Sequence, residues 1–391
     1  MPDGRDAVTV NVLSSIGEVS PEAWDACAGT DHPFTRHAFL SALEDSGSAD
    51  AESGWQPRHV VIEDGLGGLI AAAPLYLKTH SYGEYVFDWG WAEAYNRAGG
   101  SYYPKLQCAV PFTPATGPRL LVAADRPDEE RAALADALAS AMIQLAEQMK
   151  LSSLHVTFPT AAEAQRLGAL GMMQRTGQQY HWENRDYATF DDFLGQLASR
   201  KRKQIKKERR CITDNGLTVQ TLRGADIEER HWDAFYEFYR NTTDRKWGPS
   251  YLTREFFSLL GQRLGDAVVL IFVEDGNRAV AGALNLAGGD TLYGRNWGCA
   301  DDYKFLHFET CYYQAIDFAI EHGLARVEAG AQGTHKIQRG YLPSLTYSAH
   351  WIADPALREP VQRFLDEERR AVANEIEALG AHSPYRQDDS A

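Results

Sequence analysis

The sequence predicts an α/β (α+β) protein built from two domains of comparable size. Three observations support this prediction. The chain has 391 residues, which is long for one compact core and comfortable for two cores of about 190 residues each. Helical and strand periodicities alternate along its whole length. A strand–turn–strand motif occurs once in each half, at Val61–Leu75 and at Phe272–Leu284.

The repeated motif supports a division into domains 1–185 and 186–391. In each copy an apolar strand runs into Glu-Asp-Gly, and a second apolar strand follows. The copies begin 211 residues apart, at Val61 and Phe272, which is close to one domain length. Glu-Asp-Gly turns also arise by chance in β-rich proteins. The matching order of the later elements favours two copies of one α/β unit.

In the first domain, amphipathic runs mark the helices and short apolar runs between turn residues mark the strands. The segment His80–Pro118 is rich in aromatic residues and has little periodicity. A segment of this length inside a compact domain is either functional or contains unrecognised elements. The predicted helices are 21–28, 36–46, 128–150 and 161–170, and the predicted strands are 58–63, 69–78, 120–122, 154–158 and 174–182.

The second domain is predicted on the same grounds. Its most informative stretch is a helix that begins at Phe305 and ends at Gly323, followed by a strand that runs into Gly330 and Gly333. A strand that opens onto glycines and basic residues is a common way to build a ligand site. The predicted helices are 190–197, 199–215, 225–244, 253–264, 305–322 and 355–379, and the predicted strands are 217–222, 267–274, 279–287, 291–297, 325–329 and 345–352.

Composition limits the cellular compartments and the kinds of binding partner that we expect for the chain. The chain is 44% hydrophobic and 24% charged, and no apolar run approaches the ~20 residues of a membrane span. We expect no secretory leader, because the first apolar run, Val8–Ile16, lacks a basic flank and a cleavage site. The five cysteines lack a C-x-x-C pair, so we expect reduced thiols, no metal site and a cytoplasmic location. The net charge of −15 argues against general nucleic-acid binding and makes any local basic cluster more conspicuous.

One such cluster is the run Arg200–Arg210, in which eight of eleven residues are basic. Helical periodicity places Arg200, Lys203, Lys207 and Arg210 on one face. A face of like charges repels itself unless it meets anions, which favours a binding surface for phosphates on RNA or on a nucleotide-linked substrate. The alternative is a solvated surface helix.

Three further groups carry candidate chemistry. After the Gly330/Gly333 turn, Lys336 could stabilise an oxyanion, with His335 and Arg339 beside it; the alternative is a loop with surface cations. In the aromatic segment, Glu84 or Asp88 could act as a general base, with Tyr85 and Lys105 binding substrate; the alternative is core packing.

The last group lies on neighbouring strands near the predicted helix 305–322. Strand alternation would place Tyr293, Arg295 and Trp297 on one face, beside Glu309 and Glu328. A buried ion pair between Arg295 and a glutamate is the alternative to a ligand contact. The sequence contains no G-x-S-x-G, H-E-x-x-H, Walker A or G-x-G-x-x-G motif. Their absence disfavours hydrolase, metalloprotease, NTPase and dehydrogenase functions.

Three segments of the second half resemble the Fem family of aminoacyl-tRNA-dependent peptidyltransferases, a branch of the GNAT acyltransferase superfamily. They are Ser199–Val219, Leu306–Gly330, and Lys336 with Gly340-Tyr341. More closely, the chain from about residue 30 to 355 resembles the Fem-like bacterial proteins described as peptidoglycan biosynthesis or recognition proteins. The segments that carry this resemblance are PFTRHAFLSALE, APLYLK, GEYVFDW, YYPKLQCAVPFTPATGPRLL and GAQGTHKIQRGYLP.

The resemblance implies two tandem GNAT-like acyltransferase domains, each a mixed, mostly antiparallel sheet flanked by helices. It also implies acyl transfer to an amine, with Lys336 stabilising the transition state. Two departures from the pattern are visible. His335 replaces an aromatic residue, and Ile337-Gln338-Arg339 lengthens the spacing to glycine. The GNAT pyrophosphate loop has no good copy, the nearest being Gln165–Leu170, which disfavours acetyl-CoA.

The expected function is therefore an N-acyltransferase that transfers an aminoacyl or acyl group to an amine of a peptide or cell-wall precursor. No cofactor is expected to be tightly bound; the acyl donor, aminoacyl-tRNA or acyl-CoA, would be a co-substrate, and tRNA would meet the basic helix 200–210. Two alternatives remain open: an acetyl- or acyl-CoA-dependent N-acetyltransferase, and a non-catalytic protein that binds a peptidoglycan precursor or peptide.

Overall fold

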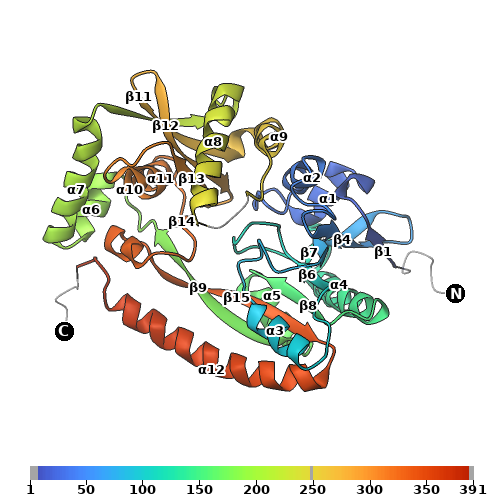
Figure 1. Cartoon of the computed structure of the whole chain (residues 1–391). Helices are drawn as coiled ribbons and strands as arrows, with labels where there is room; N and C mark the ends of the chain where they lie inside the picture. Colours follow the sequence, from blue (N-terminus) through green and yellow to red (C-terminus); the bar gives the residue numbers. More distant parts are fainter. Residues whose placement is uncertain (1–7, 247–249, 387–391) are drawn as a thin grey trace. The chain divides into compact units, whose positions relative to one another are not determined.

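A computed structural model describes residues 8–246 and 250–386 (Figure 1). The chain forms two compact units. Unit 1 runs to Gly177 and also contains Thr346–Val372, whereas unit 2 is Gln178–Leu345 and continues from Ala373. The chain passes between them within strands β9 (Met173–Glu183) and β15 (Leu342–Ile352) and helix α12 (Pro355–Gly380). Residues 346–372 thus pack in unit 1, although the sequence placed them in the second domain.

Unit 1 contains two groups of strands. A four-stranded antiparallel sheet has the order β1 (Thr9–Leu13), β3 (His59–Glu63), β4 (Leu69–Ala73) and β7 (Leu121–Val122). The second group has the order β2 (Trp55–Pro57), β5 (Leu75–Lys78), β6 (Lys105–Cys108), β8 (Ser153–Thr157) and the end of β15. Only the pair β6–β8 is parallel in this group.

One apolar core joins both groups of strands in unit 1. Helix α4 (Asp128–Gln148) contributes Leu138 and Met142, which pack with Val60 of the first sheet and Leu106 of the second group. The unit is completed by α1 (Pro21–Ala28), α2 (His37–Asp45), α3 (Trp89–Arg97) and α5 (Ala161–Ala169). Pro74 separates β4 from β5, so the strand predicted over 69–78 is two strands in different sheets.

Unit 2 is built on a mostly antiparallel sheet. Its order is β10 (Leu217–Arg223), β11 (Val268–Asp275), β12 (Arg278–Gly288), β13 (Thr291–Cys299), β14 (Arg326–Glu328) and the end of β9. Only β13 and β14 are parallel among these pairs.

Strand β11 shows why helices cover both faces of this sheet: Val269 and Ile271 face one core, and Phe272 contacts the ring of His231 on the other side. The helices of unit 2 are α6 (Phe190–Gln196), α7 (Ser199–Asp214), α8 (Glu229–Lys246), α9 (Arg254–Leu264), α10 (Leu306–Phe308) and α11 (Gln314–Glu321).

The helix predicted from Phe305 to Gly323 is interrupted. Between α10 and α11 lies one π-helical segment, Glu309–Tyr313. Such segments widen one turn and occur often at functional sites. The prediction of one continuous helix from the apolar periodicity did not include this segment.

The two copies of the repeated motif are both antiparallel hairpins. In the first, the register of β3 and β4 shifts between Ile62 and Glu63; in the second, that of β11 and β12 shifts between Val273 and Glu274. The irregularity therefore falls at the same place in each motif, just before Asp-Gly. Within the described residues, no helix combines the length and apolarity needed to cross a bilayer.

Candidate functional site

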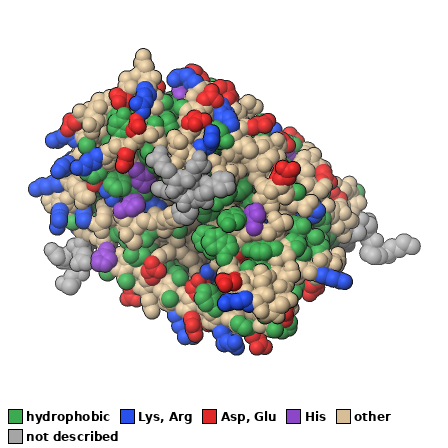
Figure 2. Space-filling view, viewed as in Figure 1, with side chains coloured by type: hydrophobic (Ala, Val, Ile, Leu, Met, Phe, Trp, Pro, Cys, Tyr) green, Lys and Arg blue, Asp and Glu red, His purple; other side chains and the backbone are tan. Residues whose placement is uncertain are grey.

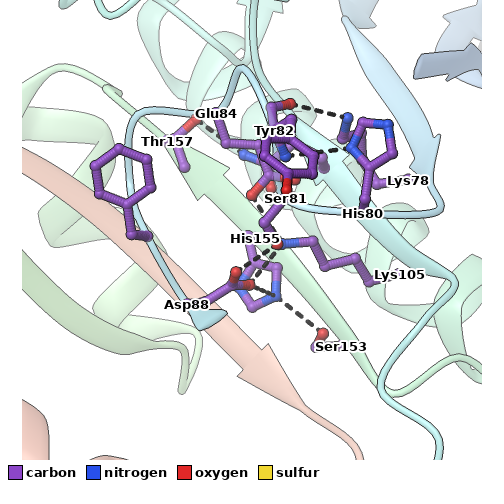
Figure 3. Close-up of polar contacts among 12 residues, drawn as sticks. Lys78, His80, Ser81, Tyr82, Glu84, Asp88, Lys105, Ser153, His155 and Thr157 are labelled. Carbon is purple, nitrogen blue, oxygen red and sulfur yellow. Dashed lines mark hydrogen bonds and ion pairs between the residues drawn. The ribbon is translucent and has the colours of Figure 1, made fainter. Parts of the chain in front are cut away.

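Two buried lysines lie opposite each other in unit 1. Lys78 ends β5, Lys105 begins β6, and the antiparallel register pairs them directly. Both are fully buried, at 0% exposure. A buried cation is costly unless acceptors surround it. The loop between Lys78 and α3 supplies these acceptors (Figure 3).

All the hydrogen-bonding capacity of Lys105 is engaged. Its Nζ donates to Glu84 Oε2 at 2.7 Å, to Asp88 Oδ2 at 2.5 Å and to Ser81 Oγ at 2.9 Å (Figure 3). Burial opposes the charged form, but the two carboxylates outweigh it and raise the pKa of Lys105. An ammonium has three N–H donors, so Lys105 has none left for a substrate.

The two carboxylates that share Lys105 are in different states. Burial raises the pKa of Glu84 to about 7, although Lys105 opposes the shift, and its Oε1 accepts no hydrogen bond from any described residue. Burial acts on Asp88 too, but Lys105 outweighs it and lowers the pKa of Asp88. Tyr102 also donates to Asp88, at 2.6 Å. Glu84 is therefore the carboxylate that can exchange a proton near neutral pH, and Asp88 is the fixed anion.

A buried histidine pair extends this cluster. Tyr102 Oη lies 3.1 Å from His155 Nε2, and His155 Nδ1 lies 2.7 Å from His350 Nδ1. Burial lowers the pKa of His155 to about 3 and that of His350 well below its ordinary value. His155 is thus neutral, and its 3.6 Å approach to Asp88 is not an ion pair. The strand pattern alone did not reveal either histidine as part of a polar network.

The loop that covers the lysines turns its aromatic side chains outward. We call this set the aromatic rim; its members are 41–55% exposed and are Tyr82, Tyr85, Phe87 and Trp89. Phe87 stacks on Trp89 with ring centroids 4.7 Å apart, and Tyr82 lies 5.9 Å from Trp89. The predicted substrate residue Tyr85 belongs to the rim and has a left-handed φ of 60°. The segment is thus polar inside and aromatic outside.

In unit 2, Lys336 is buried in the short 3₁₀ helix η5 (Thr334–Arg339). Its Nζ donates to the carbonyls of Ala329 at 2.5 Å and Gly330 at 3.2 Å, and lies 5.6 Å from the ring centre of Tyr180. Burial lowers the pKa of Lys336 to about 8. In the part of the chain that the structure describes, Lys336 has no carboxylate within ion-pair distance. Among these residues, its charge faces two carbonyl dipoles and the ring of Tyr180.

The carbonyls that hold Lys336 follow directly after β14, where the pairing of β14 with β13 ends. β13 pairs with β14 only from Thr291 to Tyr293, which faces Glu328, and then continues to Cys299. Arg295 and Trp297 lie on this second half of β13, and Arg295 is half-buried. The lysine therefore lies where the pairing of β13 with β14 ends.

One prediction about β13 is wrong. Asn285 pairs with Gly294 but Ala283 pairs with Trp297, so β13 has one extra residue between them. An inserted residue reverses the alternation of side chains. Trp297 accordingly packs with Leu292 in the core beside α11 and lies 5.3 Å from His307. It does not share a face with Tyr293.

Arg339, predicted to bind substrate, is engaged inside unit 2. Its Nη2 donates to both carboxylate oxygens of Glu208 in α7, at 2.9 and 3.0 Å, and its Nη1 to the carbonyl of His335 at 2.9 Å. His335 is half-buried, and its Nε2 lies 3.0 Å from Tyr312 Oη. Both side chains support the turn around Lys336.

Glu309 begins the π-helical segment and is 4% exposed. Its Oε1 accepts from Arg209 at 3.0 Å and from Gln314 at 2.7 Å, while its Oε2 accepts no hydrogen bond within the described part of the chain. Burial raises the pKa of Glu309, although Arg209 opposes the shift. Glu309 is thus a second carboxylate with a free oxygen.

The outer surface of α7 carries the predicted basic face. Its members are all exposed and are Arg200, Lys203, Lys207 and Arg210. Lysine and arginine side chains gather at the edge of the molecule formed by α7 (Figure 2). None of the four forms an ion pair within residues 8–246 and 250–386, whereas the inward residue Glu208 is buried.

The structure also argues against phosphate binding by the nearest match to a pyrophosphate loop. Gln165–Leu170 lies in α5 and its C-terminal cap, so its backbone amides are engaged in helical hydrogen bonds. It cannot cradle a phosphate. Among the described residues, no group of three or more His, Cys, Asp or Glu side chains could hold a metal ion.

The candidate residues therefore form two clusters. Unit 1 brings together Glu84, Asp88 and Lys105 beneath the aromatic rim. Unit 2 brings Lys336, His335 and Arg339 onto one turn. Sequence reasoning missed Lys78, Ser81, Tyr102, His155, His350 and Glu208, because their partners are distant in sequence or hidden in apolar strands.

Comparisons with known proteins agree with this architecture. FemX aligns with a TM-score of 0.55 at 13% identity, covering 91% of this chain and 100% of FemX. The C-terminal domain of a putative lysylphosphatidylglycerol synthetase from Agrobacterium fabrum gives 0.53 at 9% identity, covering 90% and 97%. A tandem GNAT protein of the clavulanic acid pathway gives 0.48 at 10% identity, covering 89% and 99%. No curated protein matches in sequence.

The predicted fold class, a mixed α/β protein of two units with mostly antiparallel strands, is confirmed by the strand order and by the likeness to the fold of FemX. The sequence profile of the FemAB-like family, described as peptidoglycan biosynthesis/recognition, matches residues 15–387. The match spans nearly all of the chain, so this protein belongs to the FemAB-like family.

Proposed function

We propose that this protein is an N-acyltransferase that transfers an aminoacyl or acyl group to an amine of a peptide or cell-wall precursor. The observation that carries the proposal is Lys336: a buried ammonium without a carboxylate partner among the described residues, at the point where the pairing of β13 with β14 ends. An unneutralised cation in a site of low dielectric stabilises negative charge strongly. A developing oxyanion would be its first anionic partner.

In the reaction, the acceptor amine attacks the carbonyl carbon of the donor and forms the C–N bond. The carbonyl oxygen gains negative charge, and Lys336 would donate its remaining N–H to it. The C–O bond of an aminoacyl ester, or the C–S bond of a thioester, then breaks. The leaving oxygen or sulfur takes the proton that the amine loses.

An aminoacyl-tRNA is the donor that the surface supports better than an acyl-CoA. The nearest match to a pyrophosphate loop, Gln165–Leu170, is helical and unavailable. The basic face, by contrast, is exposed along α7 and fits an extended phosphate backbone. Helical periodicity places it about 120° around α7 from the buried Glu208, so it lies within one helix diameter (~10 Å) of the turn that holds Lys336. A large polyanion can bridge such a distance.

Unit 1 supports a role in binding the acceptor. The aromatic rim offers flat apolar surfaces, and Glu84 below it keeps one oxygen without a partner. Aromatic side chains with a carboxylate suit a peptide or sugar that carries an amine. A place in peptidoglycan precursor metabolism and a cytoplasmic location belong to the same proposal.

A non-catalytic binding protein is the second candidate, because one observation favours it. Lys336 already donates to two backbone carbonyls, as an anchoring lysine would. Such a protein would use the aromatic rim and would need no donor.

One experiment separates these functions. The purified chain is incubated with a muramyl-peptide amine and with aminoacyl-tRNA, acyl-CoA or no donor, and products are identified by mass spectrometry. Transfer from aminoacyl-tRNA that is lost in Lys336→Met supports the proposal. Transfer from acyl-CoA supports the N-acetyltransferase. Binding of the muramyl peptide without transfer from either donor contradicts the catalytic proposal.

A further inference from the structure

We propose that Arg339, anchored on Glu208, is a positioning residue that holds the turn carrying Lys336, so that helix α7 sets where the Lys336 ammonium lies. The inference rests on the proposed function, because that function assigns the oxyanion to Lys336. It concerns two residues that touch no reacting atom. They act through the backbone on which the lysine is mounted.

The turn needs support from outside. η5 is a 3₁₀ helix of six residues, and longer runs of this helix are uncommon because its hydrogen bonds are poorly aligned. Glycines with positive φ flank it, Gly333 at 95° and Gly340 at 89°. No side chain caps its N-terminus. Because glycine has the most flexible backbone, the two ends of η5 are flexible, and η5 alone does not define the position of Lys336.

Arg339 supplies this support from within the turn. Its Nη1 donates to the carbonyl of His335, the residue immediately before Lys336, at 2.9 Å. Its guanidinium carbon lies 3.4 Å from the ring centre of Phe308 in α10. The side chain therefore folds back across the turn and ties the residue next to the lysine to a fixed helix.

Glu208 fixes the other side of the guanidinium. It is 3% exposed, and both of its oxygens accept from Arg339 Nη2. Tyr313 donates to its Oε2, and Gln204 of the same helix donates to its Oε1 at 2.9 Å. A carboxylate with this many donors has little freedom to move. Arg339 is thus held by α7 at one end and holds η5 at the other.

The pair could serve stability alone, as many buried ion pairs do. The position of the lysine separates the two roles. Lys336 Nζ reaches the carbonyls of Ala329 and Gly330 only while η5 keeps its place. If Arg339 no longer holds the turn, the Lys336 ammonium moves toward water. Its burial then decreases, and the pKa of Lys336 rises toward its ordinary value. A purely structural pair would leave the environment of Lys336 unchanged.

Other charged groups around Lys336 are accounted for. Burial, a neighbouring arginine and Lys336 together lower the pKa of His335, and the same three kinds of cause lower the pKa of His181. Burial lowers the pKa of Lys336 itself, and Cys311 opposes that shift. Neither Glu208→Gln nor Arg339→Lys removes any of these partners. A change in the titration of Lys336 in both variants would therefore report its position.

The test measures Lys336 directly and needs no substrate. The full-length protein is treated with trace acetic anhydride at pH 6 to 10, and acetylation of Lys336 is quantified by peptide mass spectrometry. The wild type should show an apparent pKa of about 8. Glu208→Gln and Arg339→Lys should raise this pKa by about one unit or more and increase acetylation at high pH several-fold. Lysine in place of Arg339 keeps the charge but loses the fork that binds two partners at once.

The matched control is Asp191→Asn. It breaks another ion pair of α7, with Lys206 at 2.8 Å, and touches neither η5 nor the charges of the helix. Its Lys336 profile should equal that of the wild type. The inference is overturned if folded Glu208→Gln keeps the wild-type profile; should that variant not fold, the profile of Arg339→Lys decides by the same criterion. A shifted profile in a protein without transferase activity would sink the proposed function and leave the positioning intact.

Discussion

Replacing Glu84 with glutamine should remove a pH dependence from the stability of the protein. The carboxyl group is 3% exposed, and its pKa rises from an ordinary 4.5 to about 7. At about 1.4 kcal/mol per unit, a shift of this size corresponds to ~3 kcal/mol of unfolding free energy. Glutamine keeps an oxygen that can accept from Lys105 but cannot ionise.

The sign follows from the direction of the shift. A raised pKa in the folded state means that the folded protein holds this proton more tightly than the unfolded chain. The stabilisation is complete below pH 4.5 and is lost as the pH rises to about 7. Asp88 acts in another window: its lowered pKa contributes stability above its ordinary 3.8 that is lost only at more acidic pH. The two carboxylates can therefore be told apart.

Urea unfolding of the wild type and Glu84→Gln at pH 4.5 and pH 8 gives the required difference. The wild type should lose ~3 kcal/mol relative to the variant over this interval. Glu93→Gln is the matched control, since Glu93 is an exposed acid of α3 that lies 3.9 Å from Arg97. It should run parallel to the wild type. If Glu84→Gln also runs parallel, Glu84 ionises normally and our account of the Lys105 cluster fails.

Three further predictions follow from the structure. If protonated Lys336 assists transfer, activity should fall as the pH rises through about 8. Lys336→Arg keeps its charge, so its loss of activity should occur at higher pH. If the pH at which activity is lost does not change, Lys336 is not the group that causes the loss. Reversing the charge of three residues of the basic face should reduce the slope of log K against log salt for tRNA by roughly two to three in a filter-binding titration, and an unchanged slope would place the tRNA elsewhere. Gly298→Ala should destabilise unit 2 by ~1–3 kcal/mol, because the added Cβ would lie 2.1 Å from the carbonyl oxygen of Phe238 in α8; an unaltered Tm would show that α8 can retreat.

Most elements were predictable because their signals are local. The amphipathic run 128–150 became α4, Asp128–Gln148, since its apolar stripe is buried by both groups of strands in unit 1. The run 199–215 became α7, with its charged face outward and Ile205 inward. The misses are short or irregular. β2 has three residues and too little periodicity to detect, and α3 and β6 are hidden among the aromatic residues of the 80–118 segment.

The site was less predictable for a physical reason. Glu84, Lys105 and Lys336 were identified as charged residues in suggestive places, but the state of each depends on atoms far away in the chain. Lys105 is unavailable because two acids from the preceding loop occupy it. Arg339 is unavailable because Glu208, 131 residues earlier, binds it.

What the sequence determined by itself is therefore the set of elements, the tandem architecture and the family, because periodicity, turn chemistry and shared segments are properties of neighbouring residues. The tertiary structure alone decided which charges are paired, which of two carboxylates keeps its proton, and which lysine stays without an anion. Those outcomes depend on burial and on distances of a few ångströms between distant segments, and electrostatic free energy varies steeply with both.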